Sequence, residues 1–138
     1  SFEKANRLNK IINSEVGLDI ILSYKRASNI LDSELKNSEI EITNTTDPGI
    51  FKTDFEKSLY KKINEIKKYY SNINNDENYE QSLSILADAK KEVFDFLDNV
   101  KVNEENETLR KNRLELINML CKTFQNFINF HLLKTNNE

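Results

Sequence analysis

Residues 96–114 read FLDNVKVNEENETLRKNRL, and this segment decides the fold. It contains the end of one stripe of apolar residues at helical spacing, a short acidic turn and the start of a second stripe. The stripe before the turn contains Tyr79, Leu83, Leu86, Val93, Leu97 and Val100. The stripe after it contains Leu109, Ile117, Leu120, Phe124, Phe127 and Ile128. We therefore predict one helix from Tyr79 to Val100, with room for a bend, and another from Glu107 to about Leu133.

Helical spacing also continues toward the N-terminus. Apolar positions predict a first helix that ends near Asn13, a second over about residues 15–33 and a third over about residues 53–73. Thr53 with Glu56 three residues later has the form of a capping box, in which each side chain bonds the other's backbone. Two Gly and one Pro among 138 residues are too few for the turns of a many-stranded β fold. The sequence thus predicts an all-α bundle of about five helices.

Residues 36–52 interrupt the helical pattern with Asn, Thr, Ser and Glu, and Asp47-Pro48-Gly49 is a turn signal. We interpret this segment as a polar linker or loop within a single domain over residues 1–138. Ile40 and Ile42 alternate with glutamates, which would allow a short extended piece. The chain begins with Ser1 and not Met, so we expect a fragment of a longer protein.

The residue inventory excludes several kinds of site. One Cys and one His, Cys121 and His131, cannot supply a zinc site, and the isolated glycines form no phosphate-binding loop. We expect a buried Cys121 thiol and a packed or capping His131. No apolar run approaches the roughly 20 residues that a membrane span needs. A net charge of −3 argues mildly against generic nucleic-acid binding but allows a local basic patch.

The order of residues in 96–114 resembles the C-terminal anticodon-binding domain of the bacterial glycyl-tRNA synthetase beta subunit. The likeness rests on FLDNVKV at 96–102 and LRKNRL at 109–114, and ETLR at 107–110 stands where this domain class has Asp-Ala-Leu-Arg. A second likeness is KRASNIL at 25–31. The chain departs from the family pattern at Lys101 and Asn103, where methionine is usual. Either this turn is more exposed, or Lys101 lies within reach of RNA.

The resemblance implies a DALR-type anticodon-binding domain that is not itself catalytic and holds no cofactor. In the complete cytoplasmic enzyme, glycine is joined to tRNA with ATP and magnesium, mainly on the alpha subunit. The implied partners are the tRNA anticodon stem-loop, the alpha subunit and the remainder of the beta subunit, without a membrane. Two alternatives stay open: the same domain type in another synthetase, such as the arginyl enzyme, and a helical assembly module that does not contact RNA.

Candidate RNA contacts are cations and amides, because Lys and Arg bind phosphates while amides read the edges of unpaired bases. In the second predicted helix Lys25 and Asn29 lie one turn apart, with a neighbouring cation beside them. The candidates are Lys25, Arg26, Asn29, Lys101, Arg110, Lys111, Asn112 and Arg113. The arginines after the turn could instead form ion pairs with its acidic residues, and for Arg113 we favour this structural role. Lysines of the third predicted helix form a further basic surface at Lys52, Lys57, Lys61, Lys62, Lys67 and Lys68.

Overall fold

The computed structural model describes residues 6, 9–10, 13–72 and 79–129. In these ranges the chain is helical and contains no strand, which confirms the all-α prediction. The elements in chain order are α2 (Glu15–Lys36), the 3-10 turn η1 (Pro48–Ile50), α3 (Asp54–Ser71), α4 (Tyr79–Ala87), α5 (Lys90–Asn99) and α6 (Glu107–Ile128). Of the first predicted helix, the structure describes residues 6, 9–10 and 13 alone. The predicted end of the last helix, residues 130–133 with His131, lies outside the described residues.

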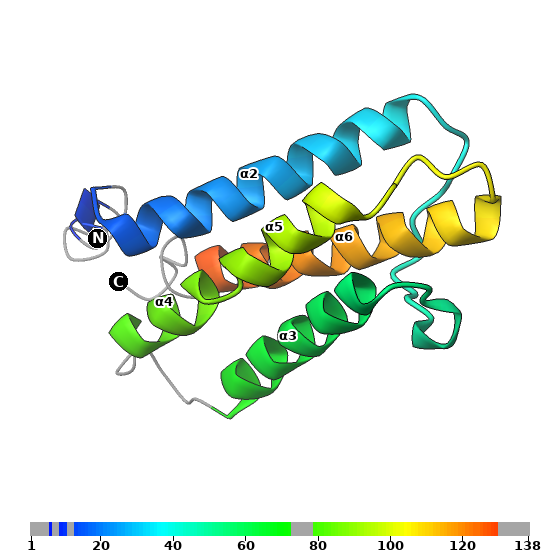
Figure 1. The fold of residues 1–138 in the computed structure, drawn as a ribbon. Helices are drawn as coiled ribbons and strands as arrows, with labels where there is room; N and C mark the ends of the chain where they lie inside the picture. Colours follow the sequence, from blue (N-terminus) through cyan, green and yellow to red (C-terminus); the bar gives the residue numbers. More distant parts are fainter. Residues whose placement is uncertain (1–5, 7–8, 11–12, 73–78, 130–138) are drawn as a thin grey trace.

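The helix α6 is the centre of the bundle. It packs against both α2 and α3, while α4 and α5 also contact these two helices (Figure 1). Residues 112–118 are all buried, so this part of α6 is enclosed on every side. Enclosure on every side removes both apolar and polar side chains from water. The polar ones must therefore find partners inside the fold.

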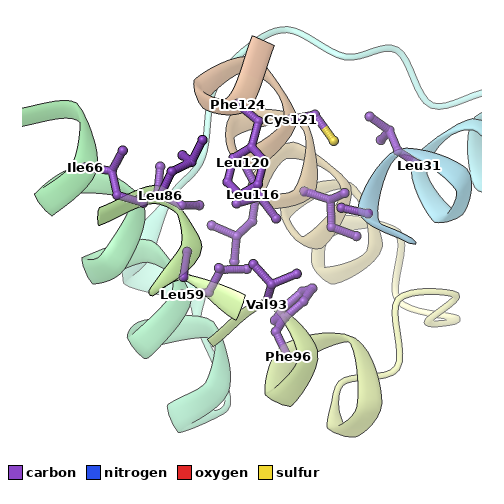
Figure 2. Packing of buried hydrophobic residues seen from close by; sticks show 14 of the residues in the cluster. Leu31, Leu59, Ile66, Leu86, Val93, Phe96, Leu116, Leu120, Cys121 and Phe124 are labelled. Atoms are coloured by element: carbon purple, nitrogen blue, oxygen red, sulfur yellow. The ribbon is translucent and has the colours of Figure 1, made fainter. Parts of the chain in front are cut away.

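The apolar core lies where the helices converge on α6. Figure 2 shows side chains of α2, α3, α4 and α5 pointing toward those of α6. Leu59, Leu86 and Phe96 are wholly buried, as are Leu116 and Phe124 of α6. Burial of each such side chain contributes about 1.5–3 kcal/mol. The predicted stripes thus supply the core as expected.

The third predicted helix starts as expected. Thr53 Oγ1 accepts a hydrogen bond from the backbone N–H of Glu56 at 3.1 Å, and Glu56 Oε1 accepts one from the Thr53 N–H at 3.0 Å. Both halves of the capping box are therefore present. The helix described ends at Ser71, and residues 73–78 lie outside the described ranges.

The single helix predicted over residues 79–100 is wrong, because the structure has two helices, α4 and α5. At the junction the Ala89 N–H donates to the Leu86 carbonyl, three residues back, in place of the four-residue step of an α-helix. This tighter step separates α4 from α5. Leu86, Ala89 and Val93 are nevertheless all buried, so both helices face the core.

Residues 37–47 connect α2 to η1 as a loop, within the segment 36–52 interpreted as a polar linker. The extended piece considered around Ile40 and Ile42 is not a strand, although both side chains pack against the core. The Asp47 side chain caps η1 by accepting from the Gly49 N–H at 2.8 Å. The loop passes the first half of α6, and this passage determines the surroundings of the candidate site.

Candidate nucleic-acid interface

Arg113 lies inside the fold, with 5% of its surface exposed. Its Nη1 donates to the Lys101 carbonyl at 2.8 Å and lies 3.4 Å from a carboxylate oxygen of Glu104. Its Nη2 donates to Glu56 Oε1 at 3.3 Å. Glu56 is fully buried and is also the acid of the capping box, so this pair joins α6 to the start of α3 and to the turn after α5. The geometry favours the structural role for Arg113.

Asn112 is also buried and holds the loop. Its Oδ1 accepts from the Asp47 N–H at 2.7 Å, and its Nδ2 donates to the Asp47 carbonyl at 2.9 Å. The Asn112 amide thus pairs with the N–H and the C=O of one residue, as the backbone of a neighbouring strand does in a sheet. The Oδ1 acceptor and the Nδ2 donor of Asn112 are therefore both engaged within the fold, and the side chain is buried.

Glu115, one turn from Lys111, is a second attachment for the loop. One oxygen accepts from the Thr43 N–H at 2.7 Å and the other accepts from the Thr45 N–H at 3.1 Å. Lys111 Nζ donates to the same carboxylate at 2.6 Å. Burial raises the pKa of this carboxyl, but the bonds from Lys111 and Thr43 together outweigh it, so the pKa lies below its ordinary value. Lys111 is thus engaged in an ion pair.

Arg110 is half-buried and also bonds the turn. Its Nη1 donates to the Glu104 carbonyl at 2.8 Å. It lines a hollow together with Glu34, Glu39 and Glu107, three acidic residues. Acidic walls repel phosphate, so this hollow is a poor place for the RNA backbone. The geometry indicates that Arg110 mainly stabilises the turn.

The KRASNIL segment of α2 meets the FLDNV segment of α5 through Arg26. Its guanidinium forms an ion pair with Asp98 and lies 5.0 Å from the centre of the Phe94 ring. The two segments that carried the family resemblance are therefore joined in space. Lys25 and Asn29 on either side of Arg26 are exposed, and neither side chain bonds another residue in the described ranges.

The turn after α5 buries its valines and exposes what lies between them. Val100 and Val102 are buried, whereas Lys101 and Asn103 face solvent. The two positions that depart from the family pattern are thus the exposed ones, which explains why polar residues are tolerated there. Since Asp98 pairs with Arg26, the same end of α5 carries both this pair and Lys101. Lys25, Asn29 and Lys101 are the predicted candidates that remain available to a ligand.

Most lysines on α3 are exposed too. Lys62 is the exception, since it is half-buried and lies 3.7 Å from Glu65. The other members of the predicted basic surface face solvent, at Lys52, Lys57, Lys61, Lys67 and Lys68. This confirms a basic helix face but leaves its role as a prediction.

Sequence reasoning missed two important acids, Glu56 as the partner of Arg113 and Glu115 as the anchor of the loop. Glu115 is flanked by Leu114 and Leu116 within a buried stretch. An acid in such a place needs partners, and this was the available signal. The identity of those partners depends on contacts between segments 57 and 72 residues apart, which spacing does not reveal.

The described residues offer little for catalysis. No cluster of three or more potential metal-binding side chains occurs among them. Burial raises the pKa of the Cys121 thiol to about 12, as expected for a packed thiol and not for a nucleophile. None of the helices in the described ranges is both long and apolar enough to cross a membrane.

Comparison with known proteins agrees with this geometry. Residues 20–135 match the family described as the DALR anticodon binding domain. Over 127 residues the chain is 30% identical to the glycine–tRNA ligase beta subunit of Rickettsia typhi. The matched segment makes up 92% of this chain and 18% of that protein. The chain is 32% identical over 130 residues to the beta subunit of Rickettsia bellii, covering 94% of this chain and 18% of the relative.

These relatives are much longer than the chain, which spans less than a fifth of their length (18%). The family match, by contrast, covers most of the chain and includes every described helix from α3 to α6 and most of α2. The chain belongs to the DALR anticodon-binding domain family.

Proposed function

We propose that this chain binds the anticodon stem-loop of a tRNA, as part of an enzyme that joins glycine to tRNA. The observation that carries the proposal is the family match over residues 20–135. The similarity to glycine–tRNA ligase beta subunits favours the glycyl enzyme over another synthetase such as the arginyl one. The domain has a binding role, while ATP and magnesium serve a catalytic centre elsewhere in the enzyme, mainly on the alpha subunit. The remaining partners are the rest of the beta subunit and the alpha subunit, in the cytoplasm.

The exposed candidates fit a contact with an RNA loop. Lys25 and Asn29 supply a cation and an amide one turn apart on α2, and both are unbonded among the described residues. Arg26 fixes this stretch of α2 against the end of α5, three residues before Lys101. Flexible lysines bind phosphates, and an amide can donate to and accept from the edge of an unpaired base. The contact surface we propose therefore consists of Lys25, Asn29 and Lys101.

The test is binding of the chain to a fluorescent RNA hairpin with a glycine anticodon, beside a hairpin whose anticodon bases are exchanged. Anisotropy titrations are made at two salt concentrations, because phosphate contacts release counterions and binding must weaken as salt rises. We expect preference for the glycine anticodon and a clear salt dependence. Lack of binding at low salt, or equal binding of the two hairpins, would contradict anticodon recognition.

A matched pair of variants locates the contact. Lys25→Ala removes a cation of the proposed surface that has no partner among the described residues, and Lys91→Ala removes an exposed cation on α5 that pairs with Asp95 at 2.7 Å. Both change the net charge by one. We expect the first to weaken hairpin binding and the second to leave it within twofold. Equal effects would mean that only the total charge matters.

Assembly within a longer protein is a second candidate function, favoured by one observation. The first turns of α2 expose large apolar side chains, with Leu18 at 50% and Leu22 at 49% of their surface. Val16 and Ile21 are exposed beside them. The occupant we infer is another part of a ligase beta subunit, since the relatives are several times longer than the matched segment. Binding of this face would not depend on RNA, so the hairpin titration separates the two functions.

A further inference from the structure

A groove lies between α3 and α6, and residues 44–46 of the loop line it as well. Its volume is about 390 Å³, within the range of about 300–1,000 Å³ that small ligands occupy. None of the RNA-contact candidates on α2, on the turn or at the start of α6 lines it. The proposed RNA contacts on α2 and on the turn therefore do not account for the groove.

One wall of the groove is aromatic and apolar. Tyr60 of α3 packs edge-on to Phe51, with ring centres 5.3 Å apart and planes at 70°, and this contact fixes the position of its ring. Met119 of α6 lines the groove as well and is half-buried. A fixed ring and a polarisable thioether suit a flat aromatic ligand, because unpaired bases stack on such surfaces.

The groove also contains amides with unused bonding capacity. Asn118 is buried, and its Nδ2 donates to Asn44 Oδ1 at 2.9 Å. This single bond leaves the Asn118 oxygen and the Asn44 nitrogen without a partner among the described residues. Asn44 has a φ of 60°, a left-handed conformation that is uncommon outside Gly and is best tolerated by residues such as Asn. Such conformations tend to be kept where a side chain has a binding role.

The charges of the groove favour an anion. Lys67 of α3 and Lys122 of α6 line it from opposite helices, and both are exposed and have no ion pair in the described ranges. The only acid of the lining is Glu115, whose charge is already balanced by Lys111 and by the loop amides. A ligand entering the groove thus meets two free cations and no free carboxylate.

We propose that this groove binds one unpaired nucleotide of the RNA. The base lies against Tyr60 and Met119, its edge meets the amides of Asn44 and Asn118, and the phosphate lies between Lys67 and Lys122. The proposal rests on the proposed function, because it takes the ligand class from anticodon-loop binding, and it adds a second contact surface on another pair of helices. An amide pair that both donates and accepts can select among bases, so the groove supplies a second place, beside Asn29, where a base edge is read.

The test compares two double variants of equal charge by titration with the fluorescent hairpin. Lys67→Gln with Lys122→Gln removes the groove cations, and Lys36→Gln with Lys91→Gln removes two exposed cations, on α2 and α5, that do not line the groove. We expect the groove pair to weaken binding about tenfold or more and to reduce the salt slope by roughly 1.4 for single-stranded contacts. We expect the control pair to change affinity by less than twofold. Equal losses in the two double variants would overturn the proposal.

The stacking surface is tested separately at Tyr60. Tyr60→Phe keeps the ring and Tyr60→Leu removes it, so a comparison of the two separates stacking from the phenol hydroxyl and from mere filling of space. We expect Tyr60→Phe to bind within twofold of the wild type and Tyr60→Leu to bind roughly tenfold more weakly. Urea unfolding of both variants shows that they are folded. Wild-type affinity of a folded Tyr60→Leu variant would overturn the proposal.

The outcomes distinguish this proposal from the proposed function. If the wild type prefers the glycine anticodon but the groove variants bind like the wild type, the groove proposal fails and anticodon binding stands. If the wild type binds both hairpins equally while the groove variants lose affinity, nucleotide binding in the groove stands and anticodon selection fails. If the wild type does not bind the hairpin at low salt, both fail.

Discussion

Several polar side chains in the first half of α6 and two exposed ones along the groove are used in opposite ways. In the first half, Asn112, Arg113 and Glu115 are buried, and each bonds a segment that is distant in the sequence. In the second half, Lys122 and Asn126 are exposed along the groove, and neither side chain has a partner in the described part of the chain. Residue type is therefore a poor guide to role in this helix, and the partners decide it.

The same contrast separates stability from binding. Buried polar groups that lose a partner cost the fold several kcal/mol, a large part of the 5–15 kcal/mol that stabilises a typical domain. Exposed groups cost the fold little but are free to meet a ligand. Substitutions in the first half of α6 should therefore lower stability, and substitutions along the groove should lower RNA affinity while leaving stability unchanged.

The largest effect is expected at the Arg113–Glu56 pair. Arg113→Met leaves the fully buried Glu56 carboxylate without its cation, and removal of one member of a buried pair costs about 3–5 kcal/mol. The free energy of unfolding in urea measures this loss. Lys101→Ala is the control, because the Lys101 side chain is exposed and only its carbonyl bonds Arg113. A loss below about 1 kcal/mol for Arg113→Met would break the comparison between the two halves.

Two asparagines of α6 provide the next test. Asn112→Ala removes both bonds to Asp47 and leaves the Asp47 N–H without its partner, at a cost of about 1–3 kcal/mol. Asn126→Ala alters an exposed residue of the groove, so its unfolding free energy should stay within about 0.5 kcal/mol of the wild type. Similar losses for the two variants would show that burial and bonding do not separate their roles.

Features of the fold that depend on residues close in the sequence could be predicted, whereas features that depend on contacts between distant residues could not. The helical stripes and the capping box of Thr53 depend on neighbours within a few positions, and these predictions were confirmed. The break at Ala89 was missed because no Gly or Pro marks it, and packing of both halves against the core decides it. The Asn112 side chain looks like an RNA ligand in the sequence because its partner, Asp47, lies 65 residues away along the chain.

Glu115 sharpens the comparison through pH. Its pKa is below its ordinary value of 4.5 in the folded chain, so the ionised carboxylate stabilises the fold above the unfolded pKa. This contribution is lost as the pH falls through the folded pKa. In Glu115→Gln one acceptor oxygen becomes a donor that faces the N–H groups of the loop, which we expect to cost about 1 kcal/mol or more at neutral pH. The difference in unfolding free energy between wild type and variant should shrink below pH 4.5, and a constant difference would contradict this linkage.

The smallest effects are expected on α2, where a bonded and an unbonded cation are neighbours. Arg26 is held by Asp98 and Phe94, so Arg26→Ala should lower the unfolding free energy by about 1 kcal/mol or less, since both contacts are partly exposed. Lys25 has no partner among the described residues, so Lys25→Ala should leave stability unchanged and weaken hairpin binding roughly threefold, with a smaller salt slope. The two variants remove the same charge from adjacent positions. In α6, partners within the fold decide the role of a polar side chain. This rule would not hold on α2 if Arg26→Ala lost affinity but kept full stability while Lys25→Ala lost stability but kept full affinity.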